Sequence, residues 1–133
     1  MRVSNLLEFT EHHRFAAARD FTLGAAERKL LSLLYQPMVG AFAIGLYHDL
    51  YHRIGEDEVG CSGLEPQRSL FLGLGLEPNA AGRGSLVREA SRLEAVGLLQ
   101  VYRRLNPVTE ETVYEYALQR PLGAAEFFAN VHL

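Results

Sequence analysis

Residues 34–40, Leu-Tyr-Gln-Pro-Met-Val-Gly, constrain the fold of this chain more than any other stretch. Pro37 lacks a backbone N–H and disfavours helical geometry at Gln36, so a first helix is predicted to end there. Gly40 can adopt backbone angles that a side chain would forbid. A second apolar helix is expected to begin near Ala41. The two helices therefore meet at a tight corner, which is scaffold and carries no catalytic chemistry by itself.

Apolar periodicity predicts four helices, and the clearest of them covers residues 41–54. Its apolar positions recur at helical spacing and are Ala43, Leu46, Tyr47, Leu50, Tyr51 and Ile54. The preceding helix is expected to bury Leu30, Leu31 and Leu34. A third helix is predicted near 66–74. Residues 73–84 are crowded with glycine and predict a loop, after which Ser85 caps a fourth helix that ends at Gly97.

Two segments alternate like strands, at residues 98–105 and 112–119, and the six residues between them suit a hairpin loop. Near the start, residues 13–21 predict a strand with Phe15, Ala17 and Phe21 on one face, although Arg19 interrupts it. Residues 4–12 are expected to form a short helix, and residues 123–133 a last one.

The order of three helices followed by a hairpin is the winged-helix plan, here with one further helix inside it. The expected fold is mainly α with a small antiparallel hairpin, an α+β modified winged helix-turn-helix with extra elements at both ends. Residues 1–22 would form an N-terminal extension and candidate oligomerisation segment, and residues 23–120 the winged-helix core. Residues 121–133 would form a helix that leads to domains absent from this chain.

Length and composition limit the possible classes of protein. A chain of 133 residues fits one domain, and its net charge of −3 differs from the basic balance usual in a dedicated nucleic-acid domain. Cys61 is the only cysteine, so an intrachain disulfide and a cysteine-based zinc site are excluded. No stretch approaches the roughly 20 apolar residues that span a bilayer. A cytoplasmic protein is expected.

The motif at 34–40, followed by Leu-Tyr-His-Asp-Leu-Tyr at 46–51, resembles the N-terminal domain of the DnaB/DnaD replication-initiation family of Gram-positive bacteria. Within that family the similarity is to the initiation and membrane-attachment branch, which is distinct from the replicative helicase. Residues 92–99, 116–122 and 126–128 continue the similarity, which covers roughly residues 27–133. Met-Val in the first motif departs from the family's usual Leu-Ile, a substitution that conserves volume.

The resemblance implies a non-enzymatic domain that self-associates as a homodimer or tetramer. Its implied partners are other primosomal initiation proteins and the helicase loader. DNA would be bound through C-terminal domains that this chain lacks, and membrane contact at the replication origin would be indirect.

Arginines gather in the fourth helix and the hairpin, and they are Arg83, Arg88, Arg92, Arg103 and Arg104. Residues 83–104 carry these five against two glutamates, a net of +3, whereas residues 105–116 carry three glutamates and no arginine or lysine. Two interpretations stay open. The basic residues form a partner-facing or solvated surface, or the chain is a transcription regulator that reads duplex DNA with helix 85–96 and the wing.

The sequence does not favour an enzyme. His48 and His52 have the spacing of a metalloprotease helix, but Asp49 stands where that motif needs Glu, so two surface histidines are the preferred interpretation. The glycines at 73–75 begin a dinucleotide-loop pattern that fails at its third glycine, and Lys29 is the only lysine, so a P-loop is missing. No cofactor and no metal are expected.

Apolar side chains near the two ends are the candidates for an oligomer interface. Phe15, Ala17 and Phe21 would either lie on the chain's own core or form an edge strand that pairs with a second copy. Phe127 and Phe128 would pack on the domain or on a neighbour.

Overall fold

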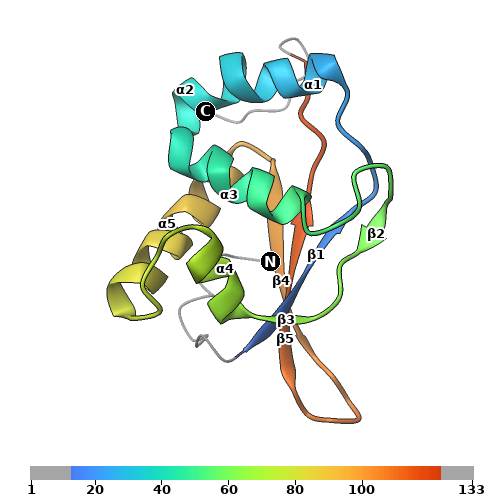
Figure 1. Ribbon diagram of the computed structural model, residues 1–133, viewed down its shortest axis with the longest axis vertical. Helices are drawn as coiled ribbons and strands as arrows, with labels where there is room; N and C mark the ends of the chain where they lie inside the picture. The colour runs from blue at the N-terminus through green and yellow to red at the C-terminus, as the bar shows by residue number, and fades with distance from the viewer. Residues whose placement is uncertain (1–12, 124–133) are drawn as a thin grey trace.

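The computed structural model describes residues 13–123 and has an α+β architecture (Figure 1). Its helices are α1 (Ala25–Leu30), the π-helical turn η2 (Leu31–Tyr35), α2 (Gln36–Val39), α3 (Ala41–Tyr51), α4 (Gln67–Gly73) and α5 (Ala80–Ala95). Its strands are β1 (Arg14–Arg19), β2 (Gly60–Cys61), β3 (Glu65–Pro66), β4 (Leu99–Leu105) and β5 (Thr112–Leu118). The predicted strand at 13–21, the helices at 41–54 and 66–74, and the hairpin are confirmed within a few residues.

A small mixed sheet forms behind the helices, in the order β2-β1-β5-β4, with β3 pairing the other end of β1. β4 and β5 are antiparallel, with Leu99 opposite Leu118, and their hairpin projects beyond the helices as a wing (Figure 1). β1 lies parallel to β5, with Phe15 opposite Tyr114. The sheet is therefore larger than the predicted hairpin, because the N-terminal strand joins it.

The core lies between α3 and the sheet and is rich in tyrosine. Its five fully buried tyrosines are Tyr35, Tyr47, Tyr51, Tyr114 and Tyr116. The hydroxyl of Tyr47 donates a hydrogen bond to the carbonyl of Gln119 at 2.9 Å, and that of Tyr116 donates to Oε1 of Gln67 at 2.9 Å. Buried hydroxyls need such partners, so these bonds fix which surfaces pack together.

The corner at 34–40 differs from the sequence prediction. The helix does not end at Gln36; it passes through Pro37 and ends at Gly40, whose φ of 90° is favoured by glycine. The N–H of Gln36 bonds to the carbonyl of Leu31, five residues back, so the turn before the proline is π-helical. A π-turn widens the helix where the proline ring would otherwise meet the carbonyl of Leu33, four residues back.

Arg19, which interrupts the alternation of β1 in the sequence, is buried and 3% exposed. Its guanidinium donates hydrogen bonds to five backbone carbonyls, those of Phe21, Tyr51, Ile54, Gly55 and Glu58, at 2.6–3.4 Å. It also lies 3.9 Å from the centre of the Tyr51 ring. A cation at the end of a helix complements the partial negative charge of the last carbonyls, so Arg19 ties β1 to the end of α3.

Candidate interaction surfaces

The helix before the wing begins earlier than predicted. Asn79 is the N-cap of α5, and its Oδ1 accepts a hydrogen bond from the N–H of Gly82 at 2.9 Å. A Cβ on Gly82 would lie 1.8 Å from the carbonyl oxygen of Glu77, so only glycine permits this approach. The expectation of a loop to residue 84 and a cap at Ser85 is therefore wrong. Gly82 of that stretch therefore serves close packing.

Two of the predicted basic residues, Arg88 and Arg92, are brought together on α5 by a buried acid. The side chain of Glu89 is 3% exposed, and its Oε1 accepts hydrogen bonds from Nε of Arg88 and Nη1 of Arg92, both at 3.1 Å. The two arginine side chains remain 62% and 51% exposed. Part of their positive charge is therefore compensated within the chain, which weakens a phosphate-binding face.

Glutamates of the wing contact one arginine of the wing and one of the neighbouring strand. Nη2 of Arg104 on β4 lies 3.4 Å from a carboxylate oxygen of Glu115 on β5. At the wing's far end, Arg14 of β1 donates two hydrogen bonds to Glu111, at 2.6 and 2.7 Å. Arg103 is exposed on β4. The wing thus carries neighbouring charges of both signs and is no uniform basic surface.

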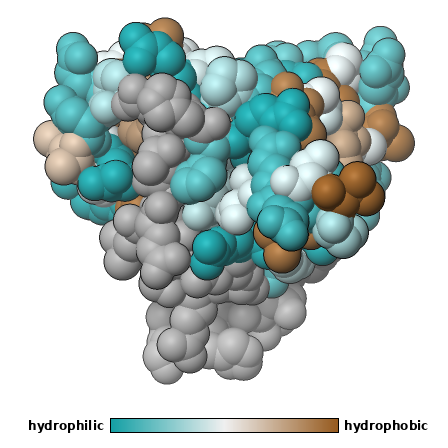
Figure 2. Space-filling model, turned by 90° about the horizontal axis from the view of Figure 1, so that it is seen from below, coloured by the Kyte–Doolittle hydropathy of each residue, from teal (hydrophilic) through white to brown (hydrophobic). Residues whose placement is uncertain are grey.

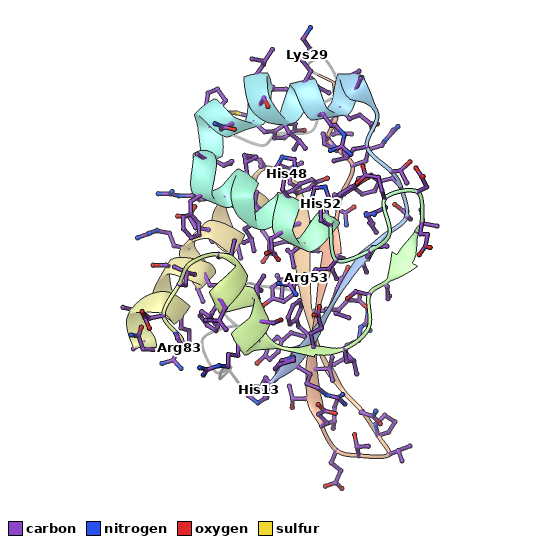
Figure 3. The ribbon with its side chains drawn as sticks, in the orientation of Figure 1. His13, Lys29, His48, His52, Arg53 and Arg83 are labelled. Carbon is purple, nitrogen blue, oxygen red and sulfur yellow. The ribbon has the colours of Figure 1, made fainter. Side chains whose placement is uncertain are left out.

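Arg83 lies in the first half of α5, and Figure 3 shows it at the end of the molecule that carries this helix. Seen from below, the coloured surface in Figure 2 is mainly hydrophilic, with small separate apolar patches. In the described part of this face, a broad apolar interface is therefore not evident.

The three N-terminal candidates for an oligomer interface belong to the core of the chain itself. Phe15 and Ala17 are 0% exposed and Phe21 is 8% exposed. β1 has β5 on one side and β2 and β3 on the other, so it offers no free edge. The edge-strand hypothesis is therefore corrected, because a charge at Phe15 would disrupt the core. Phe127 and Phe128 lie outside the described residues.

A different apolar surface lies on the outer face of α1 and η2. Leu33 is 69% exposed, and a shallow hollow of about 360 Å³ next to it is lined by Ala26, Lys29, Leu30, Leu33 and Leu34. Figure 3 shows Lys29 at this end of the molecule, directed away from the body. Of the three leucines predicted to be buried, Leu31 is fully buried, whereas Leu30 and Leu34 are only partly buried. The helical spacing of the sequence already indicates the exposure of Leu33, because a leucine outside the buried stripe of a helix must face solvent.

A second hollow, of about 390 Å³, lies between α3 and α4. It is lined by Phe42, Gly45, His48, Asp49, His52, Gly73 and Leu74. Burial, followed by the nearby charges of His52 and Arg28, holds the pKa of His48 below its ordinary value. Nδ1 of His52 is 2.8 Å from the carbonyl of His48, and the two rings stack. Among the described side chains, no group of three metal-ligating residues gathers.

The helix order, the hairpin and the helix packed before it define a winged-helix domain. Residues 10–133 match the family described as the DnaB N-terminal winged helix domain, and the chain belongs to that family. The fold is similar to the crystal structure of primosome protein DnaB, residues 1–300, from Geobacillus stearothermophilus, with a TM-score of 0.73 and 26% sequence identity. That similarity covers 95% of this chain and 45% of the other, so this chain spans less than half of that protein piece.

The family and the similar crystal structure share the description DnaB, and the solved protein is described as a primosome protein. They also confirm the winged-helix fold predicted from the sequence. Within residues 13–123, none of the helices combines the length and apolar character that crossing a bilayer requires.

Proposed function

We propose that this domain is a non-enzymatic oligomerisation and protein-interaction scaffold of a bacterial replication-initiation protein. It associates with copies of itself, as a dimer or a tetramer, and so presents attached domains in several copies. Its further partners are other primosomal initiation proteins and the helicase loader. DNA is bound by domains beyond this chain. The protein acts in the cytoplasm and reaches the membrane only through partners.

The observation that carries this proposal is the distribution of exposed apolar side chains. Leu31 of the first helix is fully buried, whereas Leu33 is 69% exposed beside a hollow that Leu30 and Leu34 also line. Exposed or half-buried apolar side chains that gather around one hollow, as Ala26, Leu30, Leu33 and Leu34 do here, are typical of a protein–protein contact. Membership of the family and the similarity to a primosome protein support the same class of function.

The test is the solution mass of the purified chain, measured with and without duplex DNA. The proposal predicts a mass above the 14.8 kDa of one chain, rising with protein concentration and unaffected by DNA. A single-chain mass at all concentrations would contradict it.

The alternative is a transcription regulator that reads duplex DNA with α5 and the wing. The exposure of Arg88 and Arg92 on α5 favours it, whereas their shared contact with Glu89 opposes it. If the alternative holds, duplex DNA is shifted at low salt, and replacing both arginines by alanine abolishes the shift. The scaffold proposal predicts no shift for the unaltered chain.

A further inference from the structure

The exposed side of α5 carries two arginines whose side chains are positioned by a buried acid. The Glu89 side chain is 3% exposed, and its carboxylate accepts hydrogen bonds from Arg88 and Arg92. A buried carboxylate needs such partners, so both guanidinium groups are held against it although each arginine side chain is more than half exposed. The two cations are therefore arranged before a ligand binds.

Each guanidinium keeps one pair of adjacent donors for a further ligand. Arg88 contacts Glu89 through Nε, which leaves its Nη1 and Nη2 groups. Arg92 contacts Glu89 through Nη1, which leaves its Nε and Nη2 groups. Within residues 13–123, none of these remaining donors has a hydrogen-bond acceptor. Two adjacent N–H groups of a guanidinium bind the two oxygens of one carboxylate, so the pair can hold two carboxylates.

The spacing of the two arginines matches that of alternate residues in an extended peptide. Arg88 and Arg92 are four residues apart on one helix, which places their Cβ atoms about 6 Å from each other. In an extended segment, residues two apart lie on the same face at about 6.7 Å. Two acidic residues with one residue between them therefore present their carboxylates to both arginines at once.

A short acidic segment fits this region better than a long polyanion does. Duplex DNA that lies along α5 also reaches the wing, where residues 105–116 hold Glu110, Glu111 and Glu115 and no lysine or arginine. Phosphates meet repulsion there, and Glu89 already compensates part of the charge on α5. A peptide with two carboxylates contacts the arginine pair alone and does not extend over the wing.

We infer that Arg88 and Arg92 form a docking site for an extended acidic segment of a partner protein, with two acidic residues at alternate positions, and that Glu89 is the positioning residue of this site. This inference rests on the proposed function, in which the domain binds other proteins, and it names the surface and the chemistry of the partner. Two exposed ion pairs give a weak, salt-sensitive contact, which linked contacts in a whole partner protein would strengthen.

The first experiment titrates the isotope-labelled chain with the peptide acetyl-Gly-Glu-Gly-Glu-Gly-amide and follows the backbone amides of α5 by NMR at low salt. The control peptide has glutamine in place of both glutamates. The amides of residues 88–92 are expected to shift, with a dissociation constant on the order of 1 mM for the glutamate peptide. The glutamine peptide is expected to bind at least about tenfold more weakly, because it has no charge to pair with the arginines.

The second experiment separates the shape of the guanidinium from its charge. Arg88→Lys combined with Arg92→Lys keeps both positive charges, but an ammonium group cannot bind the two oxygens of a carboxylate in parallel, so binding is expected to fall about fivefold or more. Arg88→Gln is expected to weaken binding about tenfold. Its matched control is Arg68→Gln, which removes a charge from an exposed position on α4 and should leave binding unchanged. Circular dichroism checks that each variant remains folded.

The outcomes separate this inference from the proposed function. If the chain self-associates but the amides of α5 do not respond to the glutamate peptide, or respond equally to the glutamine peptide, the scaffold proposal stands and this site is wrong. Unchanged binding in the double lysine variant also overturns it, because charge alone then accounts for the contact. If the chain has a single-chain mass but binds the peptide as expected, this site stands and the proposed oligomerisation is wrong.

Other occupants of the same surface would be recognised in the same assay. A duplex of about 20 base pairs, added to the complex at low salt, is expected to leave the peptide bound to α5. Displacement of the peptide by the duplex would overturn the inference in favour of the DNA-binding alternative. Shifts of the α5 amides with protein concentration alone, before any peptide is added, would show that a second copy covers the arginines and would likewise overturn it.

Discussion

The clearest test of how this fold is held together is the replacement of Arg19 by methionine. Methionine has a similar length and keeps much of the apolar stem, but it cannot donate hydrogen bonds. In the structure the Arg19 guanidinium serves five carbonyls, and three of these hydrogen bonds lie in buried surroundings, to Phe21, Tyr51 and Ile54. The substitution therefore removes the group that joins β1 to the end of α3.

The expected cost follows from those three bonds. At roughly 1–1.5 kcal/mol for each hydrogen bond lost in buried surroundings, their sum is about 3–4 kcal/mol. The contact with the Tyr51 ring adds about 1 kcal/mol, and relief from burying a cation offsets a similar amount. Small domains have a free energy of unfolding of about 5–15 kcal/mol, so Arg19→Met should remove a large fraction of it.

The assay is urea unfolding followed by circular dichroism. With a slope of about 2 kcal/mol per molar urea, the midpoint should fall by roughly 2 M. Arg88→Met is the matched control, because that side chain is 62% exposed and Glu89 keeps its bond to Arg92, so a change below about 1 kcal/mol is expected. A loss below about 1 kcal/mol for Arg19→Met, with an unchanged slope, would refute the assigned role of these bonds.

Two further predictions use matched conditions or variants. Gly82→Ala should destabilise the fold by about 2 kcal/mol or more, because its Cβ would meet the Glu77 carbonyl. Gly84→Ala has open space around its Cβ and should stabilise α5 by about 0.5–1 kcal/mol. Thermal melts of the two variants test this. The lowered pKa of His48 means that, below pH about 6.5, the unfolded chain binds a proton that the folded chain resists. The free energy of unfolding should therefore fall between pH 7.5 and 5.5, and fall less in His48→Gln; equal losses would show that His48 is not the source.

The elements with a strong repeating pattern could be predicted from the sequence. The apolar spacing of 41–54 predicted α3, and all six of its assigned core residues are buried, five of them within the helix. The alternation of 98–105 and 112–119 placed the hairpin, because strand periodicity is distinct when one face is buried.

The parts that escaped prediction depend on contacts between distant residues. The parallel pairing of β1 with β5 joins residues almost one hundred positions apart, and no local pattern encodes it. For the same reason Arg19 looked like an interruption of a strand, although its partners lie around the end of α3. The start of α5 was not predicted because the four glycines in 73–84 suggested a loop, whereas Gly82 allows a close approach to Glu77.

Pro37 also hides one surface from prediction by sequence. Ending the first helix before the proline divides residues 25–39 into a helix and a turn, and no continuous outer face follows from that division. The π-turn at η2 instead lets the helical path continue to Gly40, so Ala26, Leu30 and Leu33 belong to one rod. The buried side of this rod is fixed by Leu31 and Tyr35. Leu33 must then point to solvent or to another copy, and sedimentation of a Leu33→Glu variant beside the unaltered chain decides between these two.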